Sequence, residues 1–286
     1  MVARLPFRER LREAVAANGA PLCVGLDPDP EWLPRGLGQG LEAVRRHTLA
    51  LIEATSPYAV AYKPNLAFFE RLGSGGWELL SEVVRQARPR ALVIADGKRG
   101  DIGSTAAAYA QALYDVLQAD ACTVNPYLGH DSLAPFLSRP DRFAFLLCRT
   151  SNPGASDFQD LRVGPSGRPL YLEIAARAAE WNTTAHAGRV GLVAGATWPG
   201  ELALIRQTAP DLPLLLPGVG SQGGDLEAAV AAAGGQDGQG EYLLSVSRGI
   251  SQASLEDDYA EAAAAAAAAL RDRLIAAAGR ARVSST

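Results

Sequence analysis

Residues 91–124, ALVIADGKRGDIGSTAAAYAQALYDVLQADACTV, contain the pattern that decides the fold. An apolar run at 91–95 is followed by polar residues, then by an alanine- and leucine-rich segment at helical spacing over 105–118, and then by a second apolar run at 120–124. A strand, a helix and a second strand in this order form one unit of a parallel sheet. The stretch therefore predicts a β–α–β unit with polar residues at the carboxyl end of its first strand.

The same alternation recurs along the whole chain. Eight apolar runs predict strands at 21–26, 58–62, 91–95, 120–124, 143–148, 189–194, 213–216 and 242–246. Helical spacing predicts helices at 41–55, 76–87, 105–118, 170–185, 199–208, 224–233 and 256–278, and an N-terminal helix near 6–18 that would cap the barrel floor. Eight such units are typical of the α/β class and its closed (β/α)8 TIM barrel. A doubly wound open sheet is the alternative, but the turn after the first strand reads Gly-Leu-Asp-Pro-Asp-Pro and not GxGxxG.

Composition bounds the class of protein. The 286 residues are 48% hydrophobic, so we expect one domain, 1–286, with its core at about 20–250 and a C-terminal helix at about 256–278. The chain has no apolar run long enough to span a membrane, and its first twenty residues are charged throughout, so we expect a cytoplasmic protein without a secretory signal. The net charge of −4, without a basic run, predicts no nucleic-acid partner, and the lack of a long apolar run predicts no membrane partner. Three cysteines fall inside predicted strands without metal or disulfide spacing and should be buried thiols: Cys23, Cys122 and Cys148.

The balance between the two basic residue types is unusual. Of the 27 Lys and Arg residues, 25 are arginine, and the two lysines are Lys63 and Lys98. An ammonium is a compact charge that can lose its proton, whereas a guanidinium effectively cannot. Both lysines follow predicted strands, so chance survival of a composition bias is the weaker explanation.

Two predicted loops stand out. Residues 34–40 are short and rich in glycine. Residues 150–169, TSNPGASDFQDLRVGPSGRP, are too long for an ordinary connection. The second loop is therefore either functional or partly mobile.

Catalytic groups of a (β/α)8 barrel lie at the carboxyl ends of its strands. The polar residues there are Asp27, Lys63, Asp96 with Lys98, Asn125, Ser151, Gln222 and Arg248. If the third strand continues through Lys98, the period of two places Asp96 and Lys98 on the same side, as a pair. Asp101 is off that alternation and in a loop, so the spacing does not place it in the same pocket of its own subunit, and a residue at the start of the next helix is the alternative.

A second cluster follows the seventh and eighth strands. It reads LPGVGSQGG over 216–224 and Ser-Arg-Gly over 247–249. Barrels commonly bind phosphate here, because glycine lets backbone N–H groups approach the oxygens and the following helix presents its positive end. We therefore expect a phosphate on the substrate, held by Arg248 and by N–H groups near Gly218, Gly220 and Gly223.

Metal and serine chemistry have no support in the sequence. The three histidines are scattered, and none has a second histidine or a carboxylate at metal-ligand spacing: His47, His130 and His186. No serine has the context of a nucleophile elbow. We expect neither a metal nor any other cofactor.

These motifs resemble one known family. The segment IADGKRGDIGST is similar to the DxKxxDI signature of the orotidine 5′-phosphate decarboxylases. CVGLDPDP, AYKPNLAFFE, VNPYLG, CRTSNPG and PGVGSQGGD also resemble that family, in its longer bacterial branch. The likeness covers about 22–248 and leaves 1–20, 230–240 and the C-terminal helix without a recognised motif.

The resemblance implies the roles of the site residues. Four residues would form an alternating charge network in a homodimer, with the aspartate at 101 supplied by the partner subunit: Lys63, Asp96, Lys98 and Asp101. The binding residues would be Asp27 and the partner subunit's Thr105 for the ribose hydroxyls, Ser151 for the pyrimidine edge, Pro217 for the pocket wall, and Gln222 and Arg248 for the phosphate. The implied activity converts orotidine 5′-phosphate to uridine 5′-phosphate and CO2, with Lys98 protonating C6.

Three alternatives remain at this stage. A related Mg²⁺-dependent barrel, such as a keto-gulonate phosphate decarboxylase or a hexulose phosphate synthase, has a similar DxKxxD element, but it carries a metal-binding carboxylate where this chain has Lys63. A Schiff-base lysine requires a neutral amine, and flanking carboxylates oppose that state. The third alternative is a phosphate-binding barrel without catalysis.

Overall fold

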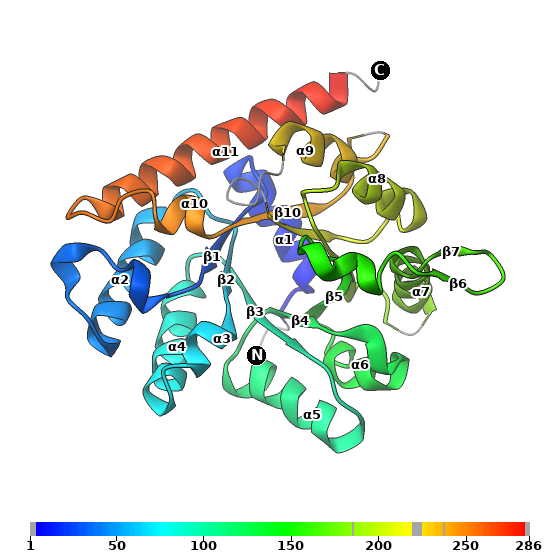
Figure 1. Ribbon diagram of the computed structural model, residues 1–286, viewed down its shortest axis with the longest axis horizontal. Coiled ribbons are helices and arrows are strands. Elements are labelled where there is room, and N and C mark those ends of the chain that lie inside the picture. The colour runs from blue at the N-terminus through cyan, green and yellow to red at the C-terminus, as the bar shows by residue number, and fades with distance from the viewer. Residues whose placement is uncertain (1–3, 185, 219–224, 237, 284–286) are drawn as a thin grey trace.

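The computed structural model describes residues 4–184, 186–218, 225–236 and 238–283. Within them, parallel strands close into an eight-stranded barrel in the order β1-β10-β9-β8-β5-β4-β3-β2, surrounded by helices (Figure 1). The barrel strands are β1 (Leu22–Leu26), β2 (Ala61–Pro64), β3 (Leu92–Arg99), β4 (Ala121–Val124), β5 (Phe143–Arg149), β8 (Val190–Ala194), β9 (Leu214–Pro217) and β10 (Tyr242–Val246). The (β/α)8 prediction is confirmed.

Two strands depart from their predicted bounds, while the other six agree within one residue. The second strand was placed at 58–62 but lies at 61–64, because the chain first turns. The N–H groups of Tyr58 and Ala59 both donate to the carbonyl of Thr55, at 3.0 and 3.1 Å. As a result, Lys63 lies inside β2 and not after it. The third strand continues to Arg99, well past its apolar run.

Every predicted helix is present. The helices are α1 (Phe7–Asn18), α2 (Leu41–Thr55), α3 (Leu66–Glu70), α4 (Ser74–Ala87), α5 (Gly103–Gln111), α6 (His130–Leu137), α7 (Leu170–Thr184), α8 (Pro199–Thr208), α9 (Leu226–Gly234), α10 (Arg248–Ser251) and α11 (Tyr259–Val283). The short helices α3, α6 and α10 were not predicted. The segment expected as one helix over 105–118 begins at Gly103 and ends in a π-helical turn, Ala112–Val116.

Helix α1 closes the amino-terminal end of the barrel, as predicted. Phe7 and Leu11 are buried together with residues from the starts of the barrel strands. The Phe7 ring stacks on Phe143 with 4.8 Å between centroids and meets Phe145 edge-on. This apolar plug leaves the carboxyl end of the barrel as the face that is open to ligands.

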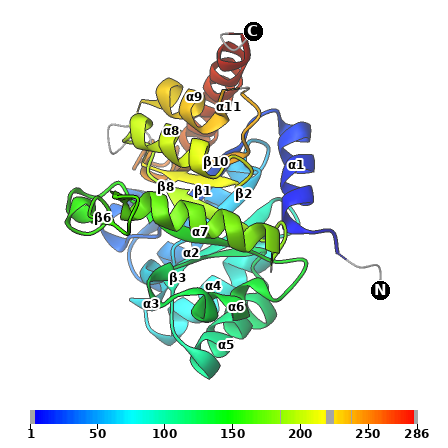
Figure 2. The same ribbon diagram turned by 90° about the vertical axis from the view of Figure 1, so that its right-hand side faces the viewer.

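The long connection after β5 has structure of its own. It contains a 3-10 turn, Pro153–Asp157, and a hairpin formed by β6 (Arg162–Val163) and β7 (Arg168–Pro169). In Figure 2 this hairpin projects on the side of the molecule opposite α1. The base of the connection is tied to the barrel, because Gln159 accepts from the Thr150 N–H at 2.8 Å and Arg149 pairs with Asp160 at 3.2 Å.

Two further expectations can be compared with the structure. Cys23, Cys122 and Cys148 are all buried, which confirms that reading. Burial raises the pKa of Cys23 and of Cys122 to about 12, so neither thiol ionises at neutral pH. Among the described residues, no helix combines the length and the apolar character that crossing a membrane requires.

Candidate active site

The two lysines meet one carboxylate at the carboxyl ends of β2 and β3. Lys63 donates from Nζ to Oδ2 of Asp96 at 2.6 Å, and Lys98 donates from Nζ to Oδ1 of the same residue at 2.7 Å. Adjacent parallel strands place their carboxyl ends at one edge, which explains why residues 33 positions apart come together. The predicted contact between Asp96 and Lys98 is present, and Lys63 extends it to a row of three charges.

The backbone geometry that brings Lys98 to Asp96 is not that of a regular strand. Its φ is +46°, in the left-handed region that residues with a side chain rarely adopt. The pairing of β3 with β4 also shifts register between Ala95 and Arg99. The two side chains therefore meet across an irregular part of the strand, and not through a simple period of two.

Burial and the neighbouring charges shift the pKa values of Lys63 and Asp96 in opposite directions. Lys63 is 6% exposed and Asp96 7%. Burial by itself would lower the pKa of Lys63, but the charges of Asp96 and Asp27 raise it above its usual value. Burial would raise the pKa of Asp96, but Lys63 and Lys98 together hold it below its usual range. Lys63 and Asp96 are therefore an ionised pair at neutral pH.

Thr123 of β4 joins the network and was missed in the sequence. It is almost fully buried, and its hydroxyl donates to Oδ1 of Asp96 at 2.8 Å. The same hydroxyl accepts from the N–H of Lys98 at 2.9 Å. A polar residue inside the apolar run DACTV was the available signal. That signal is weak, because isolated threonines are common in strands.

Asp101 and Thr105 lie at the rim of the barrel. Oδ1 of Asp101 accepts from the N–H of Ile102 at 2.7 Å. Helix α5 begins after Ile102 and has no side-chain cap, so Asp101 is not its N-cap. Thr105 is exposed on α5. Among the described residues of its own chain, Asp101 makes no hydrogen bond to Lys98 or Asp96, so the structure does not bring it into the network of one subunit.

The predicted phosphate end is described only in part. Pro217 ends β9, and Gly218 follows with φ +100°, a conformation that favours glycine. Arg248 is exposed at the start of α10, just after β10, and β10 pairs with β9. These residues therefore share one side of the mouth. Gly220, Gln222 and Gly223 lie outside the described residues.

The remaining predicted residues also follow barrel strands. Asp27 comes directly after β1, and its Oδ1 is buried without a hydrogen-bond partner among the described residues. Ser151 follows β5 and packs against Gly195 after β8; a Cβ on Gly195 would lie 3.1 Å from Cβ and N of Ser151. Glycine at 195 thus lets the Ser151 loop approach the barrel.

The histidines differ from the expectation in one respect. His130 and His186, which are far apart in the sequence, approach with 3.1 Å between their Nε2 atoms. Among the described residues, no group of three or more His, Cys, Asp and Glu side chains could hold a metal. Among the described residues, neither histidine forms a hydrogen bond with the lysine–aspartate network, and we assign the pair no role in the site.

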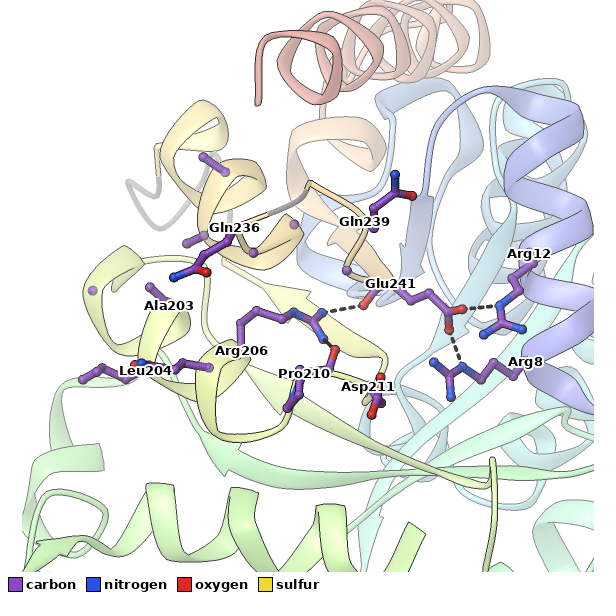
Figure 3. Close-up of a pocket in the computed structure, with 17 residues that line it drawn as sticks. Arg8, Arg12, Ala203, Leu204, Arg206, Pro210, Asp211, Gln236, Gln239 and Glu241 are labelled. Atoms are coloured by element: carbon purple, nitrogen blue, oxygen red, sulfur yellow. Dashed lines mark hydrogen bonds and ion pairs between the residues drawn. The ribbon is translucent and has the colours of Figure 1, made fainter. Parts of the chain in front are cut away.

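A separate cleft of about 910 Å³ lies at the floor of the barrel, between α8, α9 and the α1 helix (Figure 3). Arg8 and Arg12 of α1 hold the carboxylate of Glu241 on one side. On the other side, Arg206 donates to the carbonyls of Pro210 and Glu241, each at 2.8 Å. These contacts tie together the segments that enter β9 and β10. None of the predicted site residues lines the cleft, so we interpret its charged groups as structural.

The fold and the network together define a class. A closed parallel barrel with a plugged floor, and with a lysine–aspartate–lysine row at its carboxyl face, is a barrel enzyme with charged chemistry at its mouth.

Comparison with known proteins gives the family. The model of the orotidine 5′-phosphate decarboxylase / HUMPS family matches residues 20–266. Orotidine 5′-phosphate decarboxylase of Thermomicrobium roseum is 50% identical over 270 residues, 94% of this chain and 95% of that protein. The protein of the same name from Herpetosiphon aurantiacus is 49% identical over 258 residues, covering 90% and 93%. The solved OMP decarboxylase of Leishmania donovani has 43% identity and a TM-score of 0.82, covering 96% of this chain and 99% of that one. The chain therefore belongs to the orotidine 5′-phosphate decarboxylase / HUMPS family.

Proposed function

We propose that this chain is an orotidine 5′-phosphate decarboxylase of the cytoplasm, which forms uridine 5′-phosphate and CO2 in pyrimidine biosynthesis. The observation that carries the proposal is the Lys63–Asp96–Lys98 row at the carboxyl ends of β2 and β3, in which Lys63 and Asp96 are buried and Lys98 is exposed. The names of the similar proteins support the substrate.

The chemistry requires electrostatic stabilisation. When the bond from C6 to the carboxylate breaks, CO2 leaves and the electron pair stays on C6, where no carbonyl is placed to delocalise it. An ammonium fixed beside C6 stabilises this charge and then donates its proton to C6. We assign this role to Lys98, because its side chain is 49% exposed and so reaches the mouth while it remains bonded to Asp96.

The other network residues would hold the ammonium of Lys98 in position. Asp96 accepts a hydrogen bond from the Lys98 ammonium and so fixes its position, and Lys63 balances the charge of Asp96 from within the barrel. A carboxylate close to the substrate's own carboxylate also disfavours the ground state. Neither role needs a metal or another cofactor.

Binding residues around the mouth would hold the rest of the nucleotide. Asp27 has a buried, unpartnered oxygen that suits a ribose hydroxyl. Ser151 would meet the pyrimidine edge, and Pro217 would line the pocket. The phosphate would lie against Gly218, Gly220, Gln222, Gly223 and Arg248. In the part of the chain that is described, Arg248 forms no ion pair, so its guanidinium is available to a phosphate dianion.

We also propose a homodimer in which the partner subunit's Asp101 completes the network and the partner subunit's Thr105 reaches the ribose. Four large apolar side chains are exposed on the segments that follow β3 and β4: Ile102, Tyr109, Tyr127 and Leu128. These segments touch, since a Cβ on Gly100 would lie 3.2 Å from the carbonyl oxygen of Asn125. Burial of this surface by a second copy would bring Asp101 to a neighbouring site.

The Mg²⁺-dependent relatives are the alternative within the same group of barrels. A metal at the end of β2 would meet the ammonium of Lys63, which lies 2.6 Å from Oδ2 of Asp96. That ammonium repels a divalent cation and is already the counter-ion of the Asp96 carboxylate. The charge arrangement therefore favours the decarboxylase without a metal.

The decisive experiment is to add purified protein to orotidine 5′-phosphate. We expect the substrate absorbance to fall as uridine 5′-phosphate and CO2 form, at the same rate with and without EDTA. Absence of turnover would refute the proposed function. Turnover that disappears with EDTA and returns with Mg²⁺ would favour the metal-dependent alternative.

A further inference from the structure

Thr123 lies where the pairing of β3 with β4 is irregular. The pairing of β3 with β4 runs Ile94 with Ala121 and Ala95 with Cys122, and resumes at Arg99 with Val124. Three residues of β3, 96–98, therefore face one residue of β4, Thr123. The backbone ladder is interrupted at the point where the charged network is built.

The Thr123 hydroxyl fills this interruption. An N–H can only donate, so Oγ1 accepts from the N–H of Lys98 at 2.9 Å. The hydroxyl proton is then free to point at Oδ1 of Asp96, which lies at 2.8 Å. One buried side chain thus replaces a missing ladder bond and donates to the central carboxylate.

Both contacts bear on the position of the Lys98 ammonium. Lys98 has φ +46°, a conformation that persists only where surrounding contacts hold it. The Thr123 hydroxyl holds the Lys98 N–H, and it shares Oδ1 of Asp96 with the Lys98 ammonium. The Thr123 hydroxyl therefore positions the backbone of Lys98 directly, and it positions the Lys98 ammonium through Asp96.

We propose that Thr123 is a positioning residue for Lys98, fixing its left-handed backbone and the orientation of the Asp96 carboxylate. The role rests on the proposed function. It predicts an effect on the chemical step and not on nucleotide binding, because Thr123 is buried and does not reach the mouth.

Three variants separate this role from general packing. Thr123→Val keeps the shape and removes the hydroxyl, whereas Thr123→Ser keeps the hydroxyl and removes a methyl. Thr55→Val is the matched control, because Thr55 is equally buried and bonds to Leu51 and Tyr62, away from the network. We would measure kcat, KM, the dissociation constant of uridine 5′-phosphate, and Tm for each.

We expect Thr123→Val to lower kcat by about 100-fold, the effect of a displacement of about 1 Å at a reacting group. Thr123→Ser should recover most of that loss, Thr55→Val should keep the wild-type kcat, and the dissociation constant should stay unchanged in all three. Equal losses of kcat in Thr123→Val and Thr123→Ser, or wild-type kcat in folded Thr123→Val, would overturn the proposal. So would a nucleotide affinity that falls as much as kcat.

A crystal structure of Thr123→Val provides a readout that does not depend on turnover, and Thr123→Ala replaces it if that variant does not fold. We expect the φ of Lys98 to leave the left-handed region and the contact between Lys98 and Asp96 to lengthen. An unchanged Lys98 in the variant would refute the positioning role even for an inactive wild-type protein. Inactivity of the wild type alone would refute only the proposed function.

Discussion

At the residue scale, the two lysines differ because their surroundings differ. The side chain of Lys63 is 8% exposed and that of Lys98 is 49% exposed, although both bind the same carboxylate. The Lys63 ammonium lies mostly within the barrel, where it balances the charge of Asp96, whereas the Lys98 ammonium faces the mouth. Lys98 is therefore the lysine that can act on a substrate.

Replacement of Lys98 by alanine tests this division. We expect Lys98→Ala to lose decarboxylation by several orders of magnitude, because the charge and the proton at C6 both disappear. Binding of uridine 5′-phosphate should stay largely intact, since the phosphate residues are unchanged. Turnover assays and calorimetric titration with uridine 5′-phosphate measure the two effects. A variant that retained a tenth of wild-type turnover would rule out Lys98 as the proton donor.

His47 gives a prediction about stability and pH. It is 4% exposed on α2, and burial lowers its pKa to about 4, partly opposed by the nearby backbone of Ser251. Neither ring nitrogen has a well-formed hydrogen bond to a described residue. The folded state prefers the neutral ring. The contribution of His47 to the free energy of unfolding is therefore complete above pH 6.5 and is lost as the pH falls from 6.5 towards 4.

The loss should approach about 3 kcal/mol, from about 1.4 kcal/mol for each unit of pKa difference. Urea unfolding of wild type and His47→Leu between pH 7 and pH 4 measures it as the difference between the two curves. We expect the wild type to lose more stability than the variant over this range. Parallel curves would mean that His47 does not titrate differently in the folded state.

At the scale of elements, α1 acts as a separate closing piece, because a helix outside the β–α repeat seals the floor. Its contact with the barrel is concentrated in a few apolar side chains, with Phe7 stacked on Phe143. The ion pairs of Arg8 and Arg12 with Glu241 form further contacts between α1 and the barrel, at the edge of the floor. We therefore expect the stability of the floor to depend mainly on Phe7.

Phe7→Ala should lower the free energy of unfolding by about 3–5 kcal/mol, because it leaves a cavity under the barrel. Phe158→Ala is the control: Phe158 is 69% exposed, and its removal should change stability by less than about 0.5 kcal/mol. Urea denaturation of both variants makes the comparison. Similar values for the two would show that α1 is not coupled to the barrel core.

At the scale of the whole molecule, the proposed dimer makes each active site the property of two chains. Asp101 lies at the rim beside the exposed Ile102, and it bonds only locally among the described residues of its own chain. A two-fold axis would give each site one Lys98 and the other subunit's aspartate.

Mixing two inactive variants tests this arrangement. After exchange between Lys98→Ala and Asp101→Ala chains, a heterodimer has one site with both changes and one site with neither. Random exchange makes about half the dimers mixed, so roughly a quarter of wild-type activity should appear. Each parent alone should stay near background. Verified exchange without recovered activity would place Asp101 in the site of its own subunit.

The sequence by itself determined the barrel, its floor helix and the residues at its mouth. Those features follow local rules: apolar runs predict strands, helical spacing predicts helices, and the barrel places strand-end residues such as Lys63, Asp96 and Arg248 at one face. The sequence does not predict the late start of β2, since residues 58–60 are as apolar as a strand and only the turn at Thr55 excludes them.

Only the tertiary structure decided how the mouth is assembled. The left-handed Lys98, the interrupted pairing of β3 with β4 and the bridging hydroxyl of Thr123 depend on the register between two strands. The approach of His130 to His186 depends on the packing of distant segments. Periodicity reports which face a residue prefers, whereas register and barrel closure arise from contacts between residues that are remote in the chain, so no local pattern could specify them.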